Sequence, residues 1–158
     1  MPIESQELRR VMGYFATGVT IITITDRDGK PNGLTANAFM SLSLNPPLVL
    51  ISVDKGATCY TCFEIQNGFT VNFLSEEQEE ISRRFATKGI DKFAGLQWRP
   101  GGNGAAIIDG ALAHVECRIS QCYEGGDHTI VVGEILDARA TGERPLLFYR
   151  GKYQRLPG

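Results

Sequence analysis

Two long stretches near the end of the chain alternate small or apolar residues with polar ones, and this alternation constrains the fold more than any other feature. Residues 111–122 read ALAHVECRISQC, and residues 127–140 read DHTIVVGEILDARA after the turn sequence EGG. Successive side chains of a strand point to opposite faces of a sheet, so a period of two indicates strands with one buried face. The pattern predicts two long antiparallel strands, with His114 on the outer, solvent-exposed face.

Shorter stretches rich in β-branched and aromatic residues predict the remaining strands. They are residues 17–25, 33–39, 48–53, 69–74 and 145–153. Helical signals are fewer: Ser5 and Thr58 are placed to cap helices, and the capping-box sequence SEEQ at Ser75 predicts a third. Residues 89–106, which include GGNG, are expected to form a flexible connection. Strands joined by hairpins with few helices favour a mostly-β antiparallel barrel over a parallel α/β sheet.

Length and charge narrow the class of protein. The chain has 158 residues, enough for a single domain spanning residues 1–158 with a core of its own. Its 16 basic and 18 acidic residues give a formal net charge of -2, so we expect neither nucleic acid nor a membrane as a partner. No apolar run approaches the roughly 18 residues that span a bilayer, and no signal peptide is apparent. We therefore expect a cytoplasmic protein.

The four cysteines could be zinc ligands, a redox-active pair or free thiols. Cys59 and Cys62 form a CYTC pair, and Cys117 and Cys122 lie further on. A structural zinc site usually has two close pairs, and a thioredoxin-like CxxC usually lies in a βαβ unit. Neither context is present, so buried free thiols are the preferred interpretation and no metal site is expected. A redox role for the CYTC pair stays open as the weaker alternative.

The stretch 33–53, GLTANAFMSLSLNPPLVLISV, joins small, hydroxyl and amide residues to a nearly continuous apolar run. Small residues let a ligand approach the backbone, and hydroxyls and amides can hydrogen-bond a polar heterocycle. This favours a ligand-facing turn between two strands, although an ordinary strand pair with a polar connection has the same composition. His128 offers a similar choice: at the start of a strand after a tight turn it can reach a cleft, yet a lone strand histidine is often structural.

Seven segments spread along the chain carry a family resemblance. They read FATGVTIIT, GLTANAFMSLSLNPPLVLISVDK, FTVNFLSEEQEEISRRFA, DKFAG, IDGALAHVEC, GGDHTIVVGEI and PLLFYRGKY. In order and spacing they resemble the flavin reductase-like proteins with an FMN-binding split barrel. The resemblance covers nearly the whole chain, from about Leu8 to Tyr153. It implies an antiparallel, six-stranded split β-barrel of the Greek-key type with a few flanking helices.

The resemblance also implies where flavin is bound. The TANAF segment and the serines after it would lie along the flavin, the loop from Asp54 would meet the ribityl and phosphate groups, and the helix after Asn72 would add ring and phosphate contacts. The residues so implied are Thr35, Ala36, Asn37, Ser41, Ser43, Asp54, Lys55, Gly56, Ala57, Thr58, Asn72, Ser82, Arg83, Phe85, Tyr149 and Tyr153. Arg83 suits a phosphate because a guanidinium donates in a fixed fork, although a solvated helix face is its alternative. Tyr149 and Tyr153 either close over the flavin or pack on the protein.

The activity that the resemblance implies is hydride transfer from NADH or NADPH to FMN, with FAD as the alternative flavin. His128 would contact the nicotinamide or the flavin edge. Reduced flavin would then pass to a monooxygenase partner. A non-catalytic FMN-binding electron-transfer protein and a ferric reductase remain the alternatives. The resemblance further implies a homodimer with flavin near the subunit interface, and it makes Phe85 and its helix candidates for the contact.

Overall fold

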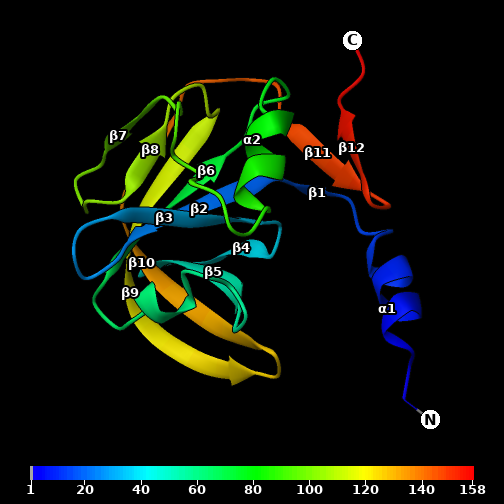
Figure 1. The fold of residues 1–158 in the computed structure, drawn as a ribbon, viewed down its shortest axis with the longest axis horizontal. Helices are drawn as coiled ribbons and strands as arrows, with labels where there is room; N and C mark the ends of the chain where they lie inside the picture. The colour runs from blue at the N-terminus through cyan, green and yellow to red at the C-terminus, as the bar shows by residue number, and fades with distance from the viewer. Residues whose placement is uncertain (1) are drawn as a thin grey trace.

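The computed structural model describes residues 2–158 and consists mostly of β-structure (Figure 1). Its strands are β1 (Thr17–Gly18), β2 (Thr20–Thr25), β3 (Pro31–Ala36), β4 (Phe39–Leu44), β5 (Pro47–Asp54), β6 (Gly68–Phe73), β7 (Trp98–Pro100), β8 (Ala106–Ile108), β9 (Ala113–Gly125), β10 (His128–Ala140), β11 (Leu146–Tyr149) and β12 (Lys152–Arg155). The α-helices are α1 (Ser5–Met12) and α2 (Glu79–Phe85). Among residues 2–158, no helix combines the length and the apolar character that crossing a membrane requires.

Seven strands form the main antiparallel sheet, in the order β3-β2-β6-β9-β10-β5-β4. β3 and β4 lie at opposite edges of this order although only Asn37 and Ala38 separate them along the chain. Because so short a link spans about 11 Å at most, the sheet must curl until its two edges approach. Within residues 2–158 no ladder joins those edges. The expected mostly-β antiparallel fold is confirmed, whereas closure into a six-stranded barrel is not, because the curled sheet has seven strands and two free edges.

The sequence predicts the positions of most strands but not all of their boundaries. Residues 40–44, expected in the turn between two strands, belong to β4, which pairs with β5. The predicted strand 145–153 is a hairpin, because Arg150 and Gly151 adopt positive φ angles of 52° and 77° between β11 and β12. This hairpin joins β1 in a separate three-stranded sheet. The main sheet therefore has one edge strand more than expected, and the C-terminal hairpin lies outside it.

Two apolar clusters form the core. The larger fills the inside of the curled sheet, where Ile51, Phe69 and Cys117 are fully buried. The smaller lies under α2 and includes Phe85 and Leu146, each 1% exposed. Phe85 is therefore buried within its own chain, so the expectation that this side chain contacts a second subunit is wrong.

All four cysteines are free thiols, as expected. Cys59 and Cys117 are buried, and Cys62 and Cys122 are half-buried. Burial raises the pKa of Cys59 to about 11 and that of Cys117 to about 12, because the thiolate is poorly solvated inside the protein. Both thiols are therefore protonated and unreactive near neutral pH.

The hairpin of β7 and β8 covers part of the outer face of the main sheet. Thr23 Oγ1 donates to a β8 carbonyl at 2.6 Å, and the Ile108 N–H donates to Asn72 Oδ1 at 2.9 Å. The sequence predicts a flexible connection over residues 89–106, and this is wrong in part, because GGNG forms the turn of an ordered hairpin. His114 lies on this covered face and is only 8% exposed, so its predicted surface position is also wrong.

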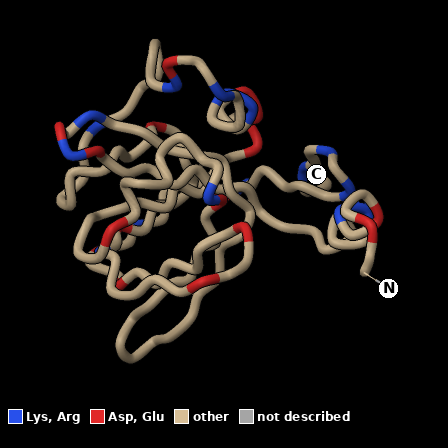
Figure 2. Tube along the Cα trace, turned by 60° about the horizontal axis from the view of Figure 1, so that its bottom comes forward, with Lys and Arg blue, Asp and Glu red and all other residues tan. Residues whose placement is uncertain are grey.

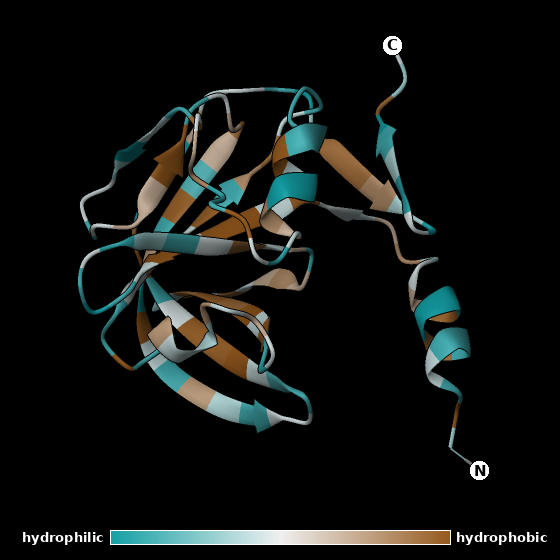
Figure 3. Ribbon diagram, in the orientation of Figure 1, coloured by the Kyte–Doolittle hydropathy of each residue, from teal (hydrophilic) through white to brown (hydrophobic). Residues whose placement is uncertain are grey.

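The helices differ from their predictions at their ends. α1 stands apart from the main sheet, beside the β11–β12 hairpin (Figure 1), and none of its residues is buried. Figure 3 shows apolar residues on it between hydrophilic ones. α2 begins at Glu79 rather than directly after Ser75, although Gln78 Oε1 accepts the Ser75 N–H at 2.9 Å as in half of a capping box. The helix expected after Thr58 is reduced to the 3-10 turn Tyr60–Cys62.

Candidate functional site

A cavity of about 210 Å³ lies between β3, the loop after β5 and the end of α2. Its lining residues are Gly33, Leu34, Thr35, Asp54, Ala57, Thr58, Cys59, Phe85, Ala86, Lys88 and Lys92. The wall is tightly packed at Gly33, where a Cβ atom would lie 2.7 Å from the Ile22 carbonyl and 3.0 Å from the Phe85 ring. Only glycine lets β3 pass this close to the helix, so the shape of this wall is set by the core beneath it.

Two lysines place positive charge at the cavity. Lys92 Nζ donates to the Gly33 carbonyl at 2.9 Å, and Lys88 Nζ donates to the Gly56 carbonyl at 3.2 Å. Burial lowers the pKa of Lys92, because its ammonium group has lost water without gaining a carboxylate partner. A bound anion would supply that missing counter-charge. Neither lysine is among the residues that the resemblance implies, although Lys92 belongs to its DKFAG segment.

Five residues that the resemblance implies line this cavity: Thr35, Asp54, Ala57, Thr58 and Phe85. Thr35 Oγ1 donates to the Ser82 carbonyl at 2.6 Å and so ties β3 to α2. Asp54 Oδ1 accepts the Gly56 N–H at 2.8 Å and shapes the loop at the opposite wall. The cavity therefore combines hydroxyl groups, an aromatic ring, two cations and one carboxylate. The hydroxyls, the ring and the cations suit a ligand with a polyol, a flat ring and a phosphate.

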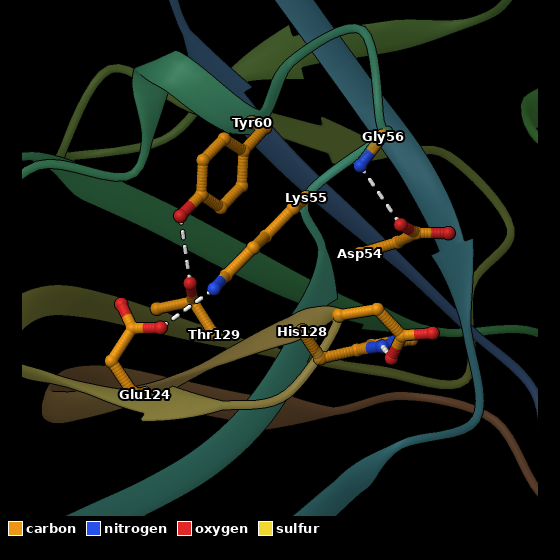
Figure 4. Close-up of polar contacts among 8 residues, drawn as sticks. Asp54, Lys55, Gly56, Tyr60, Glu124, His128 and Thr129 are labelled. Carbon is orange, nitrogen blue, oxygen red and sulfur yellow. Dashed lines mark hydrogen bonds and ion pairs between the residues drawn. The ribbon is translucent and has the colours of Figure 1, made fainter.

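The Lys55 side chain points toward Glu124 and not toward the cavity, where the resemblance implies a contact with the flavin. Its Nζ lies 2.6 Å from Glu124 Oε2, near the end of β9, and Figure 4 shows the side chain extending toward that turn. The hydrogen bond that Lys55 donates to Glu124 is the main cause that raises the pKa of Lys55. Beside it, the hydroxyls of Tyr60 and Thr129 lie 2.7 Å apart. Lys55 is thus outside the cavity lining, whereas Gly56 meets the cavity only through its contacts with Asp54 and Lys88.

His128 begins β10 directly opposite Asp54, its pairing partner on β5. Its Nδ1 lies 2.8 Å from Asp127 Oδ1 (Figure 4), and the side chain is 39% exposed. The hydrogen bond to His128 lowers the pKa of Asp127. Since Asp54 lines the cavity, His128 stands one strand away from it, with a half-exposed imidazole oriented by a carboxylate. Such a ring can contact a second ligand that lies beside the first.

Two implied residues of α2 face the C-terminal hairpin instead of the cavity. Ser82 is fully buried, and its Oγ lies 2.6 Å from the Tyr153 hydroxyl. The Arg83 guanidinium lies 4.9 Å from the centre of the Tyr153 ring and is paired with Glu79 at 2.9 Å. Figure 2 shows acidic and basic residues side by side on this helix. Lys55, Thr58, Ser82 and Arg83 are therefore not brought together in one anion site in this chain.

Asn72 has a clear structural position. It is fully buried, its Nδ2 donates to the Ile21 carbonyl at 3.2 Å, and its Oδ1 accepts the Ile108 N–H at 2.9 Å. These bonds hold β8 against the main sheet. The side chain lies outside the cavity lining.

The TANAF segment lies at the edges of the main sheet. Asn37 and Ser41 are exposed, Ser43 is half-buried and Ala36 is buried. An apolar cavity of about 170 Å³ opens nearby, lined by Gly18, Val19, Thr20, Phe39, Phe73, Leu74, Leu112, Pro145 and Leu146. Exposed amide and hydroxyl groups thus adjoin an apolar recess along one segment of chain. Tyr149 lies elsewhere and packs edge-on against Tyr14, with ring centres 6.3 Å apart.

A larger cavity, of about 640 Å³, is a different one. It lies by the β2–β3 hairpin turn and is lined by Thr25, Asp26, Arg27, Asp28, Thr61, Cys62, Glu64 and Asn67. Arg27 and Glu64 pair across it at 2.8 Å, and both are more than half exposed. No residue that the resemblance implies lines it, so size alone does not mark the site.

The chain is similar to several known flavin reductases. A reductase subunit of a flavin-dependent monooxygenase, HsaB from Mycobacterium tuberculosis, is 43% identical over 154 residues, covering 96% of this chain and 82% of that protein. A protein from Streptomyces globisporus named as an NADH-dependent FAD reductase is 43% identical over 160 residues, covering 98% and 87%. A solved structure of the Streptomyces globisporus NADH:FAD oxidoreductase SgcE6, in complex with NAD and FAD fragments, has a TM-score of 0.91 at 41% identity, covering 99% and 97%.

The family model described as "Flavin reductase like domain" matches residues 12–157 of the chain. The match spans every element of the main sheet, both lysines of the 210 Å³ cavity and the strand that begins at His128. This chain therefore belongs to the flavin reductase-like domain family.

Proposed function

We propose that this protein is a flavin reductase that transfers a hydride from NADH to FMN or FAD. The observation that carries the proposal is the cavity bounded by β3, the loop after β5 and the end of α2, which holds Lys88 and Lys92 beside Thr35, Thr58 and Phe85. The names of its relatives favour a reductase over a non-catalytic electron carrier or a ferric reductase.

Hydride transfer depends on how the two ring systems are positioned more than on acid–base groups. Hydride passes directly between the two ring systems, which must be held near van der Waals contact. Lys92 and Lys88 would hold a flavin phosphate, and Thr35 and Thr58 would bond the ribityl hydroxyls. His128, oriented by Asp127 and opposite Asp54, would position the nicotinamide.

The choice of flavin and the choice of hydride donor are argued from different observations. FMN and FAD share the ring, the ribityl chain and the first phosphate, so the two lysines favour binding of both flavins over riboflavin. NADH is proposed as the donor because a relative 43% identical is named as NADH-dependent. Reduced flavin would serve a separate monooxygenase, as the names of relatives described as reductase subunits or components suggest.

One kinetic experiment tests this function. Purified protein is mixed with NADH or NADPH and with FMN, FAD or riboflavin, and nicotinamide oxidation is followed by absorbance. We expect turnover with NADH and either phosphorylated flavin, and a higher KM for riboflavin. Absence of nicotinamide oxidation with every pair of substrates would contradict the proposal.

We also propose a homodimer in which α1 contacts the second copy. Leu8, Val11, Met12 and Phe15 are 44%, 46%, 63% and 78% exposed on or just after this helix. Such apolar exposure on a helix with no buried residue is typical of an interface. The dimer implied by the resemblance would use this surface instead of Phe85.

A further inference from the structure

We propose that His114, Glu116 and Asp137 form a binding site for one divalent transition-metal ion, with zinc as the ion that fits best. Their ligand atoms all lie within 4.8 Å of one another. None of the three lines the proposed flavin cavity, so this inference stands apart from the proposed function.

The strand pattern brings the first two ligands together. His114 and Glu116 are two residues apart on β9, so both side chains point to the same face of the sheet. Val115 and Cys117, on the opposite face, belong to the larger apolar cluster. The histidine and the carboxylate are therefore adjacent on the outer face, on which the β7–β8 hairpin docks and where its Asn103 contacts Glu116.

A β-bulge brings the third ligand. Ile135 pairs with Cys117, but Asp137, not Leu136, pairs with Glu116, because the register shifts between Ile135 and Asp137. In a regular ladder Leu136 would face Glu116, and Asp137 would point into the apolar core. The extra residue turns Asp137 to the face of Glu116, which is the kind of re-aiming that bulges produce next to functional sites.

Burial and hydrogen bonding leave two of these ligands with free capacity. His114 is 8% exposed, and no residue between 2 and 158 makes a hydrogen bond to its ring nitrogens. Glu116 is 6% exposed, and its Oε1 accepts the Asn103 N–H at 3.2 Å, which leaves Oε2 for another partner. The fully enclosed side-chain atoms without a partner among the described residues are Thr17 Oγ1 and Glu76 Oε2, so the His114 nitrogens and Glu116 Oε2 still reach solvent. A metal ion would replace water at these atoms. Asp137 is exposed and can move to complete the site.

The donor set selects the ion. One imidazole nitrogen and two carboxylate oxygens suit zinc, with bonds of about 2.0 to 2.2 Å and water as the fourth ligand. In tetrahedral geometry such ligand atoms lie about 3.4 Å apart, so a pair at the 4.8 Å limit of this cluster must draw together by roughly 1 Å. Arg139 faces His114 across the ladder, and its Nε lies 3.9 Å from Asp137 Oδ2. Exposed pairs at this distance are weak, so Arg139 can turn to solvent when the ion binds.

Zinc and cobalt titrations of the full-length, tag-free protein, dialysed against a chelator, test the site. We expect one zinc ion per chain by calorimetry, and a cobalt spectrum without thiolate-to-metal charge transfer. At a hundredfold excess over Kd, zinc should raise the unfolding midpoint by about 5 to 10 °C. Asp137→Asn is the main variant, because an exposed residue can be changed without loss of folding. It should weaken zinc binding at least tenfold, and His114→Gln should do the same.

Asp28→Asn is the matched control, since Asp28 is an exposed carboxylate in the β2–β3 turn with no histidine beside it. Its zinc affinity and midpoint shift should equal those of the unmodified protein. Equal zinc affinity in Asp137→Asn and Asp28→Asn overturns the proposal. So does a thiolate band in the cobalt spectrum, which would assign the ion to cysteine, and so does the absence of any saturable binding.

Discussion

The hydroxyl of Tyr153 on β12 lies 2.6 Å from the hydroxyl of Ser82 on α2, although 71 residues separate them along the chain. Ser82 is fully buried, and its carbonyl also accepts a hydrogen bond from Thr35 on β3. One residue of α2 thus joins the C-terminal hairpin to the wall of the candidate flavin cavity. Contacts of this kind fix the position of the helix that carries Phe85 against the cavity.

Tyr153→Phe should destabilise the protein by about 1 to 3 kcal/mol, because it leaves the buried Ser82 hydroxyl without its partner. Urea unfolding at neutral pH measures the change. Tyr149→Phe is the control: Tyr149 is exposed, and its loss should cost less than about 0.5 kcal/mol. Equal free energies of unfolding for the two variants would show that the Ser82 contact contributes nothing.

Lys92→Met should raise the Kd for FMN and for FAD about tenfold, or about 1.4 kcal/mol, because it removes the charge proposed to meet the phosphate. The Kd for riboflavin should change little. Flavin titrations followed by fluorescence measure all three constants. Lys55→Met is the matched control, since Lys55 is directed at Glu124 and should affect FMN less. An equal loss for riboflavin and FMN would contradict a phosphate contact.

His128→Ala should lower kcat/KM for NADH by about tenfold to a hundredfold, or about 1 to 3 kcal/mol, and leave flavin Kd nearly unchanged. The reason is that hydride transfer depends on the placement of the nicotinamide, which His128 is proposed to hold. Steady-state kinetics and flavin titration together separate the two effects. Asp127→Asn keeps the turn and should affect activity less. Normal kinetics in His128→Ala would make His128 a structural strand residue.

Cys117 should make the protein lose stability at high pH. Its folded pKa, raised by burial to about 12, lies above the ordinary value of 9.0. The unfolded thiol therefore ionises first, so this contribution is complete below about pH 9 and is lost as pH rises toward 12. Between pH 8 and pH 10.5 the loss is about 2 kcal/mol.

Urea unfolding at these two pH values compares the unmodified protein with Cys117→Ala. The variant should lose about 2 kcal/mol less over this range. Cys62→Ala is the control, because that thiol is only half-buried and should change the pH dependence less. Identical pH dependence in all three proteins would show that Cys117 ionises equally in both states.

Met12→Glu should shift a dimer toward monomer, because it places a charge on the exposed apolar face of α1. Light scattering coupled to size-exclusion chromatography at micromolar concentration measures the mass. Gln6→Glu changes the charge equally on the same helix and should leave the dimer intact. A monomeric unmodified protein that still binds flavin would refute the interface.

The sequence predicts the strands well where the evidence for them is local. Period-two alternation over residues 111–122 and 127–140 matches β9 and β10 within a few residues. The pattern fails at β4, whose edge position leaves both faces partly exposed, and at residues 89–106, where an ordered hairpin depends on hydrogen bonds to Thr23 and Asn72. Strand propensity carries no information about such distant partners.

The residues of the candidate flavin site were likewise predicted only in part. Resemblance alone implies Thr35, Asp54 and Thr58, and these line the cavity. It does not point to Lys88 or Lys92, because their position at the cavity depends on contacts with the carbonyls of Gly56 and Gly33, which are distant along the chain.

The outer face of β9 shows most clearly which features the sequence determines locally and which depend on the tertiary structure. Alternation by itself places His114 and Glu116 on one side of a strand, because side-chain direction is a local property of the backbone. The docked β7–β8 hairpin contacts Glu116 through the Asn103 N–H, and a register shift next to Leu136 supplies the third member of the cluster. Pairing with a neighbouring strand sets the face on which Asp137 lies, so only the folded sheet brings this carboxylate to the histidine.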